Sequence, residues 1–185
     1  IIISLINLQS NSIKDSALLK MFHDSTNRIR AMALVHEKLY RSEDIAKIDF
    51  TSYLRTIAEE LHGSYTTTLN SPHLSIEADD MHLGVDHAIP CGLIVNELIT
   101  NALKYAFPNG GEGNAITISL RHSGSDDITL IVTDNGIGIP EAIDIDNTTS
   151  LGLQLVNVLI KQIHGIRTVS RAGGTSWTIT FPITE

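Results

Sequence analysis

The N-terminal part of the chain has apolar residues at intervals of three, four and seven, the spacing of one face of an α-helix. The pattern indicates the end of one helix at residues 1–9, a polar turn at residues 11–15, and a long helix from an N-cap at Asp15 to about Arg41. The first segment is apolar at Ile2, Leu5, Ile6 and Leu8, and the recurring positions of the long helix are Leu18, Phe22, Ile29, Met32, His36 and Leu39. Because such a helical hairpin cannot bury its own apolar seam well, we expect it to dimerise into a four-helix bundle.

The pattern changes after residues 42–47, which are charged and have no periodicity, so a domain boundary is expected near residue 45. Helices are predicted at residues 51–61, closed by Gly63, at residues 86–105, with Asp86 as cap and Pro90 in the first turn, and at residues 151–164, ended by Gly165. Strands are predicted at residues 66–69, 74–77, 115–120 and 128–133, around Val169 and at residues 176–181, with turns at residues 71–72 and 123–127. This order predicts an α+β fold: a helical segment at residues 1–45, then a two-layer sandwich at residues 46–185 with one mixed sheet and helices on one face.

The helix around residues 96–105 has an unusual polar face. Its sequence is Asn-Glu-Leu-Ile-Thr-Asn-Ala-Leu-Lys-Tyr, and helical periodicity places Glu97, Asn101, Lys104 and Tyr105 on one side. The opposite arc is apolar and contains Cys91, Val95, Leu98, Ile99, Ala102, Leu103 and Ala106. The polar groups offer a base, a metal ligand, a phosphate partner and a flat surface for stacking. Taken alone, the pattern fits a core helix with a solvated side equally well.

Two glycine-bearing segments favour the functional interpretation. The strand at residues 128–133 runs into Asp-Asn-Gly-Ile-Gly-Ile-Pro at residues 134–140, where a carboxylate can accept a hydrogen bond from a ligand amine while the glycines allow close backbone approach. The alternative is an Asn-Gly hairpin turn, but the residues after it do not resume a strand. Thr-Ser-Leu-Gly-Leu at residues 149–153 opens a helix whose free N–H groups and positive dipole end suit a phosphate. That second signal is weak by itself, and Gly-Gly-Thr at residues 173–175 is weaker.

Composition narrows the classes of function. The 185 residues fit one ordinary domain with an extra element, and 13 basic against 21 acidic residues give a net charge of −8, which argues against a nucleic-acid surface but not against a nucleotide. The single cysteine, Cys91, excludes an internal disulfide and is expected to be a buried structural thiol. No apolar run approaches the roughly 18 residues of a membrane span, so we expect a cytoplasmic location and no membrane contact by this piece. The chain starts at Ile1, which indicates a fragment of a longer protein that is free to be membrane-anchored.

Four of these segments, in this order, resemble the ATP-binding domain of sensor histidine kinases. That superfamily also holds type II topoisomerases, heat-shock chaperones and mismatch-repair ATPases. The N box of the family matches residues 96–105, the two glycine boxes match residues 134–138 and 150–153, and the terminal Gly-Thr matches residues 174–175. The resemblance covers about residues 47–185 and is highly specific.

The resemblance implies that ATP and Mg²⁺ bind between the N-box helix and a short lid at residues 141–150. The implied nucleotide-binding residues are Asn101, Lys104, Tyr105, Asp134, Gly136, Gly138, Ile139, Leu151, Gly152, Leu153 and Thr175. In this scheme Asp134 accepts from the adenine amine, Ile139 and Tyr105 flank the base, and Asn101 ligates Mg²⁺. Lys104 meets phosphate, backbone donors near Gly152 and Leu153 hold the phosphate chain, and Glu97 is a catalytic base or polarising group.

The helical hairpin narrows the resemblance to the subfamily related to the HWE kinases, whose second dimerisation helix is similar to residues 28–40. In that subfamily the phosphoacceptor histidine lies shortly before a segment resembling residues 1–10, so we expect this chain to begin after it. His36-Glu37 is similar to the His-Glu pair of ordinary histidine kinases but lacks the Arg-Thr-Pro that should follow, which favours a half-buried histidine at the bundle seam. The other seven histidines show no metal-ligand grouping.

The implied function is the catalytic and ATP-binding core of a two-component sensor histidine kinase. It would move the γ-phosphoryl group of ATP to a histidine and on to the receiver domain of a response regulator, as a homodimer through its N-terminal helices and without nucleic acid. One alternative is an ATP-hydrolysing conformational switch of the same superfamily, a chemistry that Glu97 would suit. The other is a non-enzymatic dimer module.

Overall fold

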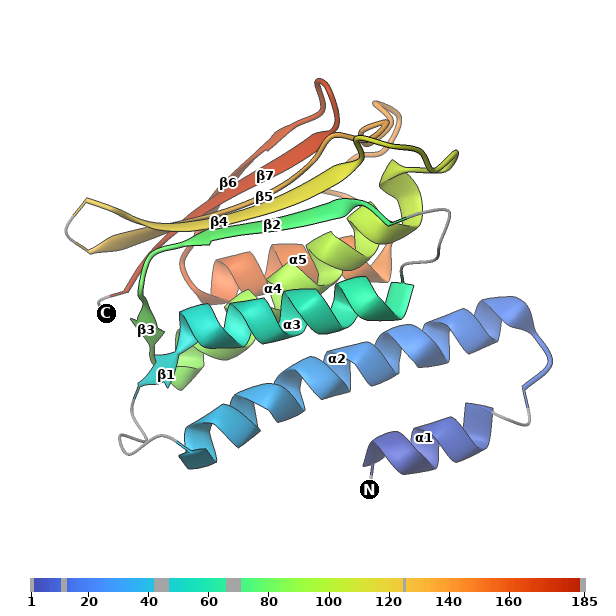
Figure 1. Cartoon of the computed structure of the whole chain (residues 1–185), viewed down its shortest axis with the longest axis horizontal. Helices are drawn as coiled ribbons and strands as arrows, with labels where there is room; N and C mark the ends of the chain where they lie inside the picture. The colour runs from blue at the N-terminus through green and yellow to red at the C-terminus, as the bar shows by residue number, and fades with distance from the viewer. Residues whose placement is uncertain (1, 11–12, 42–46, 66–70, 125, 184–185) are drawn as a thin grey trace.

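The chain folds into a sheet layer, a helical layer beneath it, and a long helix on the far side of that layer (Figure 1). The computed structural model describes residues 2–10, 13–41, 47–65, 71–124 and 126–183. The helices are α1 (Ile2–Ser10), α2 (Ser16–Arg41), α3 (Phe50–Tyr65), α4 (Val85–Asn101) and α5 (Leu151–Gln162). Helices α3, α4 and α5 lie against one face of the sheet, and α2 packs on α3 and α4 from the other side, with α1 beside it. The expected N-terminal helical pair and α+β sandwich are confirmed.

The main sheet is mixed and has the strand order β2-β4-β5-β7-β6. Its strands are β2 (His73–Ala78), β4 (Ala115–Ser123), β5 (Asp127–Asp134), β6 (Ile166–Ser170) and β7 (Thr175–Pro182). Strand β2 is parallel to β4, and the other neighbours are antiparallel. A small antiparallel pair, β1 (Ile48–Asp49) with β3 (His82–Leu83), closes the end of the molecule where α4 begins.

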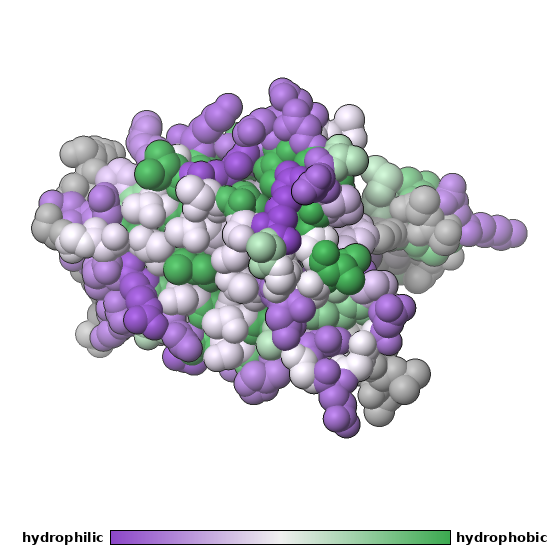
Figure 2. All heavy atoms as spheres, turned by 90° about the horizontal axis from the view of Figure 1, so that it is seen from above, coloured by the Kyte–Doolittle hydropathy of each residue, from purple (hydrophilic) through white to green (hydrophobic). Residues whose placement is uncertain are grey.

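Strict alternation along the central strands separates the two faces of the sheet. The inward side chains of β5 are Ile128, Leu130, Val132 and Asp134, and those of β7 are Thr175, Trp177, Ile179 and Phe181, all buried. The outward side chains are mostly threonine and serine, and Thr129–Thr180 and Thr133–Ser176 pair across the strands by hydrogen bonds. Figure 2, which views this outer face, shows pale and purple residues with scattered green ones. The sheet therefore has one apolar face, covered by helices, and one polar face.

Several boundaries differ from the sequence-based prediction. Asp15 caps α2 as expected, accepting a hydrogen bond from the Leu18 N–H at 3.3 Å. Asp86 does not cap α4, because the helix already starts at Val85 after Gly84, and Pro90 lies inside it rather than in its first turn. Helix α3 continues through Gly63 to Tyr65, and α5 stops at Gln162. The predicted strand at residues 66–69 and nearly all of the charged segment at residues 42–47 fall outside the described residues.

The left-handed residue after α5 is His164, with φ 53°, rather than the glycine that follows it. The hydrogen bond from the Gly165 N–H to the Ile160 carbonyl, 2.8 Å long, closes this helix end. A Cβ at Gly165 would lie 3.3 Å from Ile160, so this glycine provides close packing instead of a positive φ.

The N-box helix changes from α-helical to π-helical winding within the N box. Helix α4 ends at Asn101 and continues as a single π-helical turn, Ala102–Ala106. The predicted apolar arc is confirmed, since all its members are buried. Because a π turn is wider than an α turn, the positions of Lys104 and Tyr105 depart from the uniform helix that the sequence suggested. Such turns occur frequently at functional sites.

Within the described part of the chain, no helix combines the length and the hydrophobicity that a bilayer span requires.

Candidate functional site: two adjoining cavities beside the N-box helix

A cavity of about 420 Å³ opens between the end of α4, the ends of β5 and β7, and residues 138–150. Its walls are largely apolar and include Leu98, Val132, Ile139, Ile143, Leu153 and Trp177. Asp134 and Thr175 add polar groups at the ends of neighbouring strands, where they are paired in register. A concave, mostly apolar pocket with a few fixed polar groups is the general form of a small-molecule site.

Asp134 is the fixed polar group of this larger cavity. It continues the inward alternation of β5, so its carboxylate faces the helical layer and is only 7% exposed. Its Oδ1 accepts hydrogen bonds from the backbone N–H groups of Gly136, at 2.9 Å, and Thr175, at 3.2 Å. Among the described residues Oδ2 has no partner, so one carboxylate oxygen is held by the backbone while the other is available to a ligand donor.

Two glycines allow the backbone segments around Asp134 to approach one another closely. At Gly174 φ is 117°, and a Cβ there would overlap the Asp134 backbone carbonyl. At Gly138 φ is 74°, and a Cβ would lie 2.9 Å from the Arg171 carbonyl oxygen. Both positions therefore require glycine for conformation and for space. The hairpin interpretation of residues 135–136 is wrong, since the Ile137 N–H bonds to the Ala106 carbonyl of the π turn instead of returning along β5.

Side chains of β6, of α5 and of Arg171, which follows β6, make hydrogen bonds to the lid at residues 141–150 and to Pro140 before it. Arg171 donates to the carbonyls of Pro140, at 3.0 Å, and Ile143, at 2.9 Å. Arg167 donates to Asp146, and Asn157 donates to the Ile145 carbonyl at 2.8 Å. Two of the residues held in this way, Pro140 and Ile143, line the larger cavity.

The lid contains a tight turn at residues 144–147. Asp144 accepts from the side chain of Asn147 at 2.9 Å and from the backbone N–H groups of Asp146 and Asn147. These hydrogen bonds, led by the one from the Asn147 side chain, lower the pKa of the Asp144 carboxyl.

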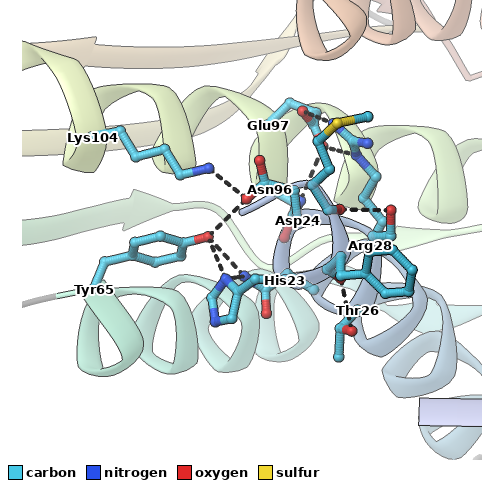
Figure 3. Close-up of polar contacts among 12 residues, drawn as sticks. His23, Asp24, Thr26, Arg28, Tyr65, Asn96, Glu97 and Lys104 are labelled. Atoms are coloured by element: carbon cyan, nitrogen blue, oxygen red, sulfur yellow. Dashed lines mark hydrogen bonds and ion pairs between the residues drawn. The ribbon is translucent and has the colours of Figure 1, made fainter. Parts of the chain in front are cut away.

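A second cavity, of about 180 Å³, lies between α4, α2 and the start of α5. Asn101, Tyr105 and Ser150 border both cavities, so the two adjoin. The smaller one is lined mostly by polar residues, which include the four side chains of two ion pairs (Figure 3). The Lys104 ammonium bonds to Asp24 Oδ1 at 2.5 Å, and Arg28 makes a two-pronged ion pair with Glu97, with Nε–Oε1 at 2.5 Å and Nη2–Oε2 at 2.8 Å.

Glu97 also lies against the start of α5. A Cβ built on Gly152 would be only 2.5 Å from Glu97 Oε2, so this carboxylate sits beside the helix N-terminus. Ser150, the N-cap residue of α5, makes no side-chain capping bond there. Free N–H groups and the helix dipole favour a negative group at such a place.

The structure brings most of the predicted residues to these cavities. The larger one is lined by Asn101, Tyr105, Asp134, Gly138, Ile139, Leu153 and Thr175, and the smaller one by Glu97, Asn101, Lys104, Tyr105, Leu151 and Gly152. Within the described part of the chain Gly136 borders neither cavity. It packs behind Asp134, where a Cβ would collide with Ala106. The alternative of a core helix with a solvated side is wrong at Glu97, which α2 covers and which is 4% exposed, whereas Tyr105 on the same face is 56% exposed.

Sequence reasoning missed the residues that α2 and α3 contribute. Asp24, Arg28 and Tyr65 reach the smaller cavity from positions 38 to 80 residues away from their partners. It also missed Trp177, although the alternation of β7 places it on the inward face beside Thr175.

The histidines whose side chains the structure describes form no second site. His23 bonds to the Tyr65 hydroxyl at 3.2 Å, and His62 bonds to the Pro72 carbonyl at 2.7 Å. Among the described residues no three His, Cys, Asp or Glu side chains are grouped to hold a metal ion. The side chain of His36 lies outside what the structure describes. Cys91 is fully buried, as expected, and burial raises the pKa of its thiol.

Comparison with known proteins gives a family that includes histidine kinases for each of the two parts of the chain. Residues 1–65 match the family described as histidine kinase, and residues 86–185 match the histidine kinase-, DNA gyrase B- and HSP90-like ATPases. Blue-light-activated histidine kinase 2 of Erythrobacter litoralis is 29% identical over 195 residues, covering 100% of this chain and 53% of that protein. Sensor histidine kinase PdtaS of Mycobacterium tuberculosis is 25% identical over 158 residues, covering 85% of this chain and 31% of that protein. The chain thus spans about half or less of the curated relatives it matches.

A solved structure agrees along nearly the whole length. The histidine kinase domain of the Erythrobacter litoralis EL346 blue-light-activated kinase superposes with a TM-score of 0.81 at 26% identity, covering 98% of this chain and 84% of that one. The ATPase match spans more than half of the chain and contains the N-box helix, the glycine segments and both strands that hold Asp134. This chain belongs to the histidine kinase-, DNA gyrase B- and HSP90-like ATPase family, in its sensor histidine kinase branch of the HWE-related type.

Proposed function

We propose that this chain is the nucleotide-binding and phosphoryl-transfer core of a two-component sensor histidine kinase, with ATP as phosphoryl donor. Adenine enters the larger cavity, and the phosphates run past Asn101 towards the start of α5. The names and fold of its relatives support this assignment. In this scheme residues 1–45 are the dimerisation segment and residues 46–185 the catalytic domain.

The observation that carries the proposal is the setting of Asp134. A carboxylate that is 7% exposed borders a largely apolar cavity, and two backbone N–H groups hold one of its oxygens while the other has no partner among the described residues. The exocyclic amine of adenine is a donor that suits this acceptor, and the flat base suits walls made by Ile139, Leu153 and Trp177. Tyr105 is 56% exposed at the rim and can cover the base from outside.

Mg²⁺ fits the polar groups at the junction of the cavities. Asn101 is half-buried there and borders both spaces, so its side-chain oxygen is placed for one ligand bond. Mg²⁺ usually keeps waters and takes phosphate oxygens, so it does not need a cluster of protein carboxylates. We assign Asn101 as the protein ligand, Lys104 and the start of α5 as phosphate partners, and Glu97 as the base or polarising group.

The proposed partners follow from the same chemistry. Exposed apolar residues mark the N-terminal helices, with Leu5 56%, Leu8 67% and Met21 60% exposed, and we assign this surface to a second copy of the chain.

We also propose a cytoplasmic location and a response regulator as partner, because ATP and the receiver domains of response regulators occur in the cytoplasm.

Titration calorimetry with ADP and Mg²⁺ tests the binding step, and the single tryptophan, Trp177, reports occupancy because it lines the larger cavity. We expect binding heat together with a change in tryptophan emission. Heat without an emission change, or no heat at all, would contradict nucleotide binding in this cavity.

Phosphoryl transfer is tested with ATP labelled on its γ-phosphate and with the chain extended upstream of Ile1. We expect acid-labile, base-stable label on the extended protein, which is the behaviour of a phosphohistidine. If residues 1–185 alone become labelled and His36→Ala removes the label, then His36 is the phosphoacceptor. The expectation that the phosphoacceptor lies before Ile1 would then be wrong.

A second candidate, ATP hydrolysis, is favoured by one observation. Glu97 lies one helical turn before Asn101 and borders the same cavity, where a carboxylate can activate water. Free phosphate without labelled protein, stopped by Glu97→Gln, would support hydrolysis over phosphoryl transfer to histidine.

A further inference from the structure

Helix α2 binds both charged side chains that the N box directs into the smaller cavity. Asp24 and Arg28 lie one turn apart on α2 (Figure 3). Asp24 pairs with Lys104 on the π turn, and Arg28 pairs with Glu97 on α4. All four side chains are largely shielded: their exposed fractions are 25% and 16% for Asp24 and Arg28, and 11% and 6% for Lys104 and Glu97. These are not the solvated surface pairs whose contribution is small.

Neighbouring groups hold the Asp24 carboxylate in place. The Tyr65 hydroxyl donates to Asp24 Oδ1 at 3.3 Å and accepts from the Asn27 amide at 2.9 Å. The Lys104 ammonium also lies 5.4 Å from the centre of the Tyr65 ring. Burial raises the pKa of Tyr65, and the Asp24 carboxylate adds to the rise, so the phenol stays protonated as a donor.

The protein's own carboxylates occupy the positions that suit phosphate. Asp24 neutralises Lys104, and Glu97 sits beside Gly152 at the N-terminus of α5. An incoming polyphosphate therefore meets a lysine that is already paired and a helix end that already has a negative neighbour. In a partly buried site such charges are weakly screened, so the competition is strong.

We propose that α2 is a phosphate-displaceable latch on the N box, in which Asp24 competes directly with the nucleotide phosphates for Lys104. The Arg28–Glu97 pair holds α2 in this docked position while Lys104 is engaged by Asp24. Because linkage is reciprocal, polyphosphate binding weakens the docking of α2 to the same extent that docking weakens polyphosphate binding. This inference rests on the proposed nucleotide site and adds a regulatory contact to it.

The test compares ADP with adenosine on Asp24→Asn, which removes one charge at nearly constant side-chain volume. We expect ADP to bind the variant about fivefold or more tightly than it binds the wild type, because a shielded ion pair no longer competes. Adenosine has no phosphate, so its affinity should stay the same. Asp80→Asn is the matched control: Asp80 is exposed beside β3, away from the N-box end of α4, and its variant should leave both affinities unchanged.

Two further measurements separate competition from a general change in folding. In a Lys104→Met background, Asp24→Asn should change ADP affinity by less than about twofold, because the shared partner is gone. Amide hydrogen exchange in the described middle of α2, residues 21–31, should speed up when ADP binds the wild type and should not respond to adenosine.

The outcomes are distinguishable. Unchanged or weaker ADP binding by Asp24→Asn, with wild-type ADP binding intact, would overturn the latch and leave the nucleotide site standing. Equal tightening of ADP and adenosine would also overturn the latch, because the effect would then not depend on phosphate. Failure of both ligands to bind either protein would overturn the nucleotide site and the latch with it.

Discussion

The two cavities adjoin at Asn101 and Tyr105, yet they are built by different means. The larger one draws its walls from residues 98–177, and backbone N–H groups and close-packed glycines fix its one buried carboxylate. The smaller one takes part of its wall from α2 and from Tyr65 at the end of α3. Two ion pairs, Arg28–Glu97 and Asp24–Lys104, join the α2 side of this wall to the N-box side.

This difference indicates that the proposed base-binding part is preformed, whereas the proposed phosphate-binding part can be adjusted. Backbone geometry around Asp134 leaves little freedom, and the proposed base-binding part takes its walls from the sheet, α4, α5 and the lid without a contribution from the described side chains of α2. The proposed phosphate-binding part depends on where α2 lies, since Lys104 and Glu97 are held by side chains of that helix. A change in the position of α2 can therefore alter phosphate binding without disturbing base recognition.

The largest effect is expected from breaking the larger cavity at its tightest point. Gly174→Ala places a Cβ over the Asp134 carbonyl at a φ of 117°, and should lower the free energy of unfolding by about 3 kcal/mol or more and abolish binding of both adenosine and ADP. Gly173→Ala is the control, because φ is 71° there but no atom lies within 4 Å of the added Cβ, so only about 1–2 kcal/mol is expected. Denaturant unfolding measures both variants, and equal costs would show that the close approach at Gly174 contributes nothing.

A smaller effect is expected from loosening the lid over the same cavity. Arg171→Ala removes the hydrogen bonds to the Pro140 and Ile143 carbonyls, which should weaken adenosine and ADP equally, by roughly fivefold. Arg121→Ala is a suitable control, since Arg121 pairs with Glu77 on the exposed face of the sheet. An effect on ADP alone would contradict the assignment of Arg171 to the base-binding part.

Periodicity predicted the sheet well because burial and strand pairing follow local alternation. The run of inward residues in β5 and the helical arc around Cys91 are both visible in the sequence, and both are buried as expected. The glycine segments were also recognisable, since steric demand at Gly138 and Gly174 leaves glycine as the residue that fits. These features are set by residues close together in the chain.

The rest depends on contacts between distant segments. Asp24 meets Lys104 across 80 positions, and nothing in either local pattern indicates the partner. The π turn at Ala102–Ala106 was missed because the residues of an α-helix and a π turn follow the same local propensities. Cap positions also shifted: Gly84 precedes α4 where Asp86 was expected, since tertiary packing can override a capping preference.

The smallest response is expected at a buried position on α4, the helix that contributes residues to both cavities. Cys91 is fully buried on the apolar side of α4, and burial raises its thiol pKa above the ordinary value of 9.0, so the folded protein should react very slowly with a maleimide or an aromatic disulfide at pH 8. Because this pKa is higher in the folded state, the stability associated with the neutral thiol is fully present below pH 9 and declines as the pH rises further. Asp24→Asn should leave the thiol equally protected, and rapid labelling of that variant would show that α4 opens when α2 is released.

The most direct test of the account compares ADP with inosine diphosphate, which carries an oxygen in place of the adenine amine. We predict that the wild-type chain prefers ADP by about tenfold or more, because Asp134 Oδ2 accepts a hydrogen bond from the amine and faces a second acceptor in inosine. Asp134→Asn should remove most of this preference, whereas Asp127→Asn, at the exposed opposite end of β5, should keep it. Equal affinity of the wild type for the two nucleotides would contradict the central claim that Asp134 recognises adenine in the larger cavity.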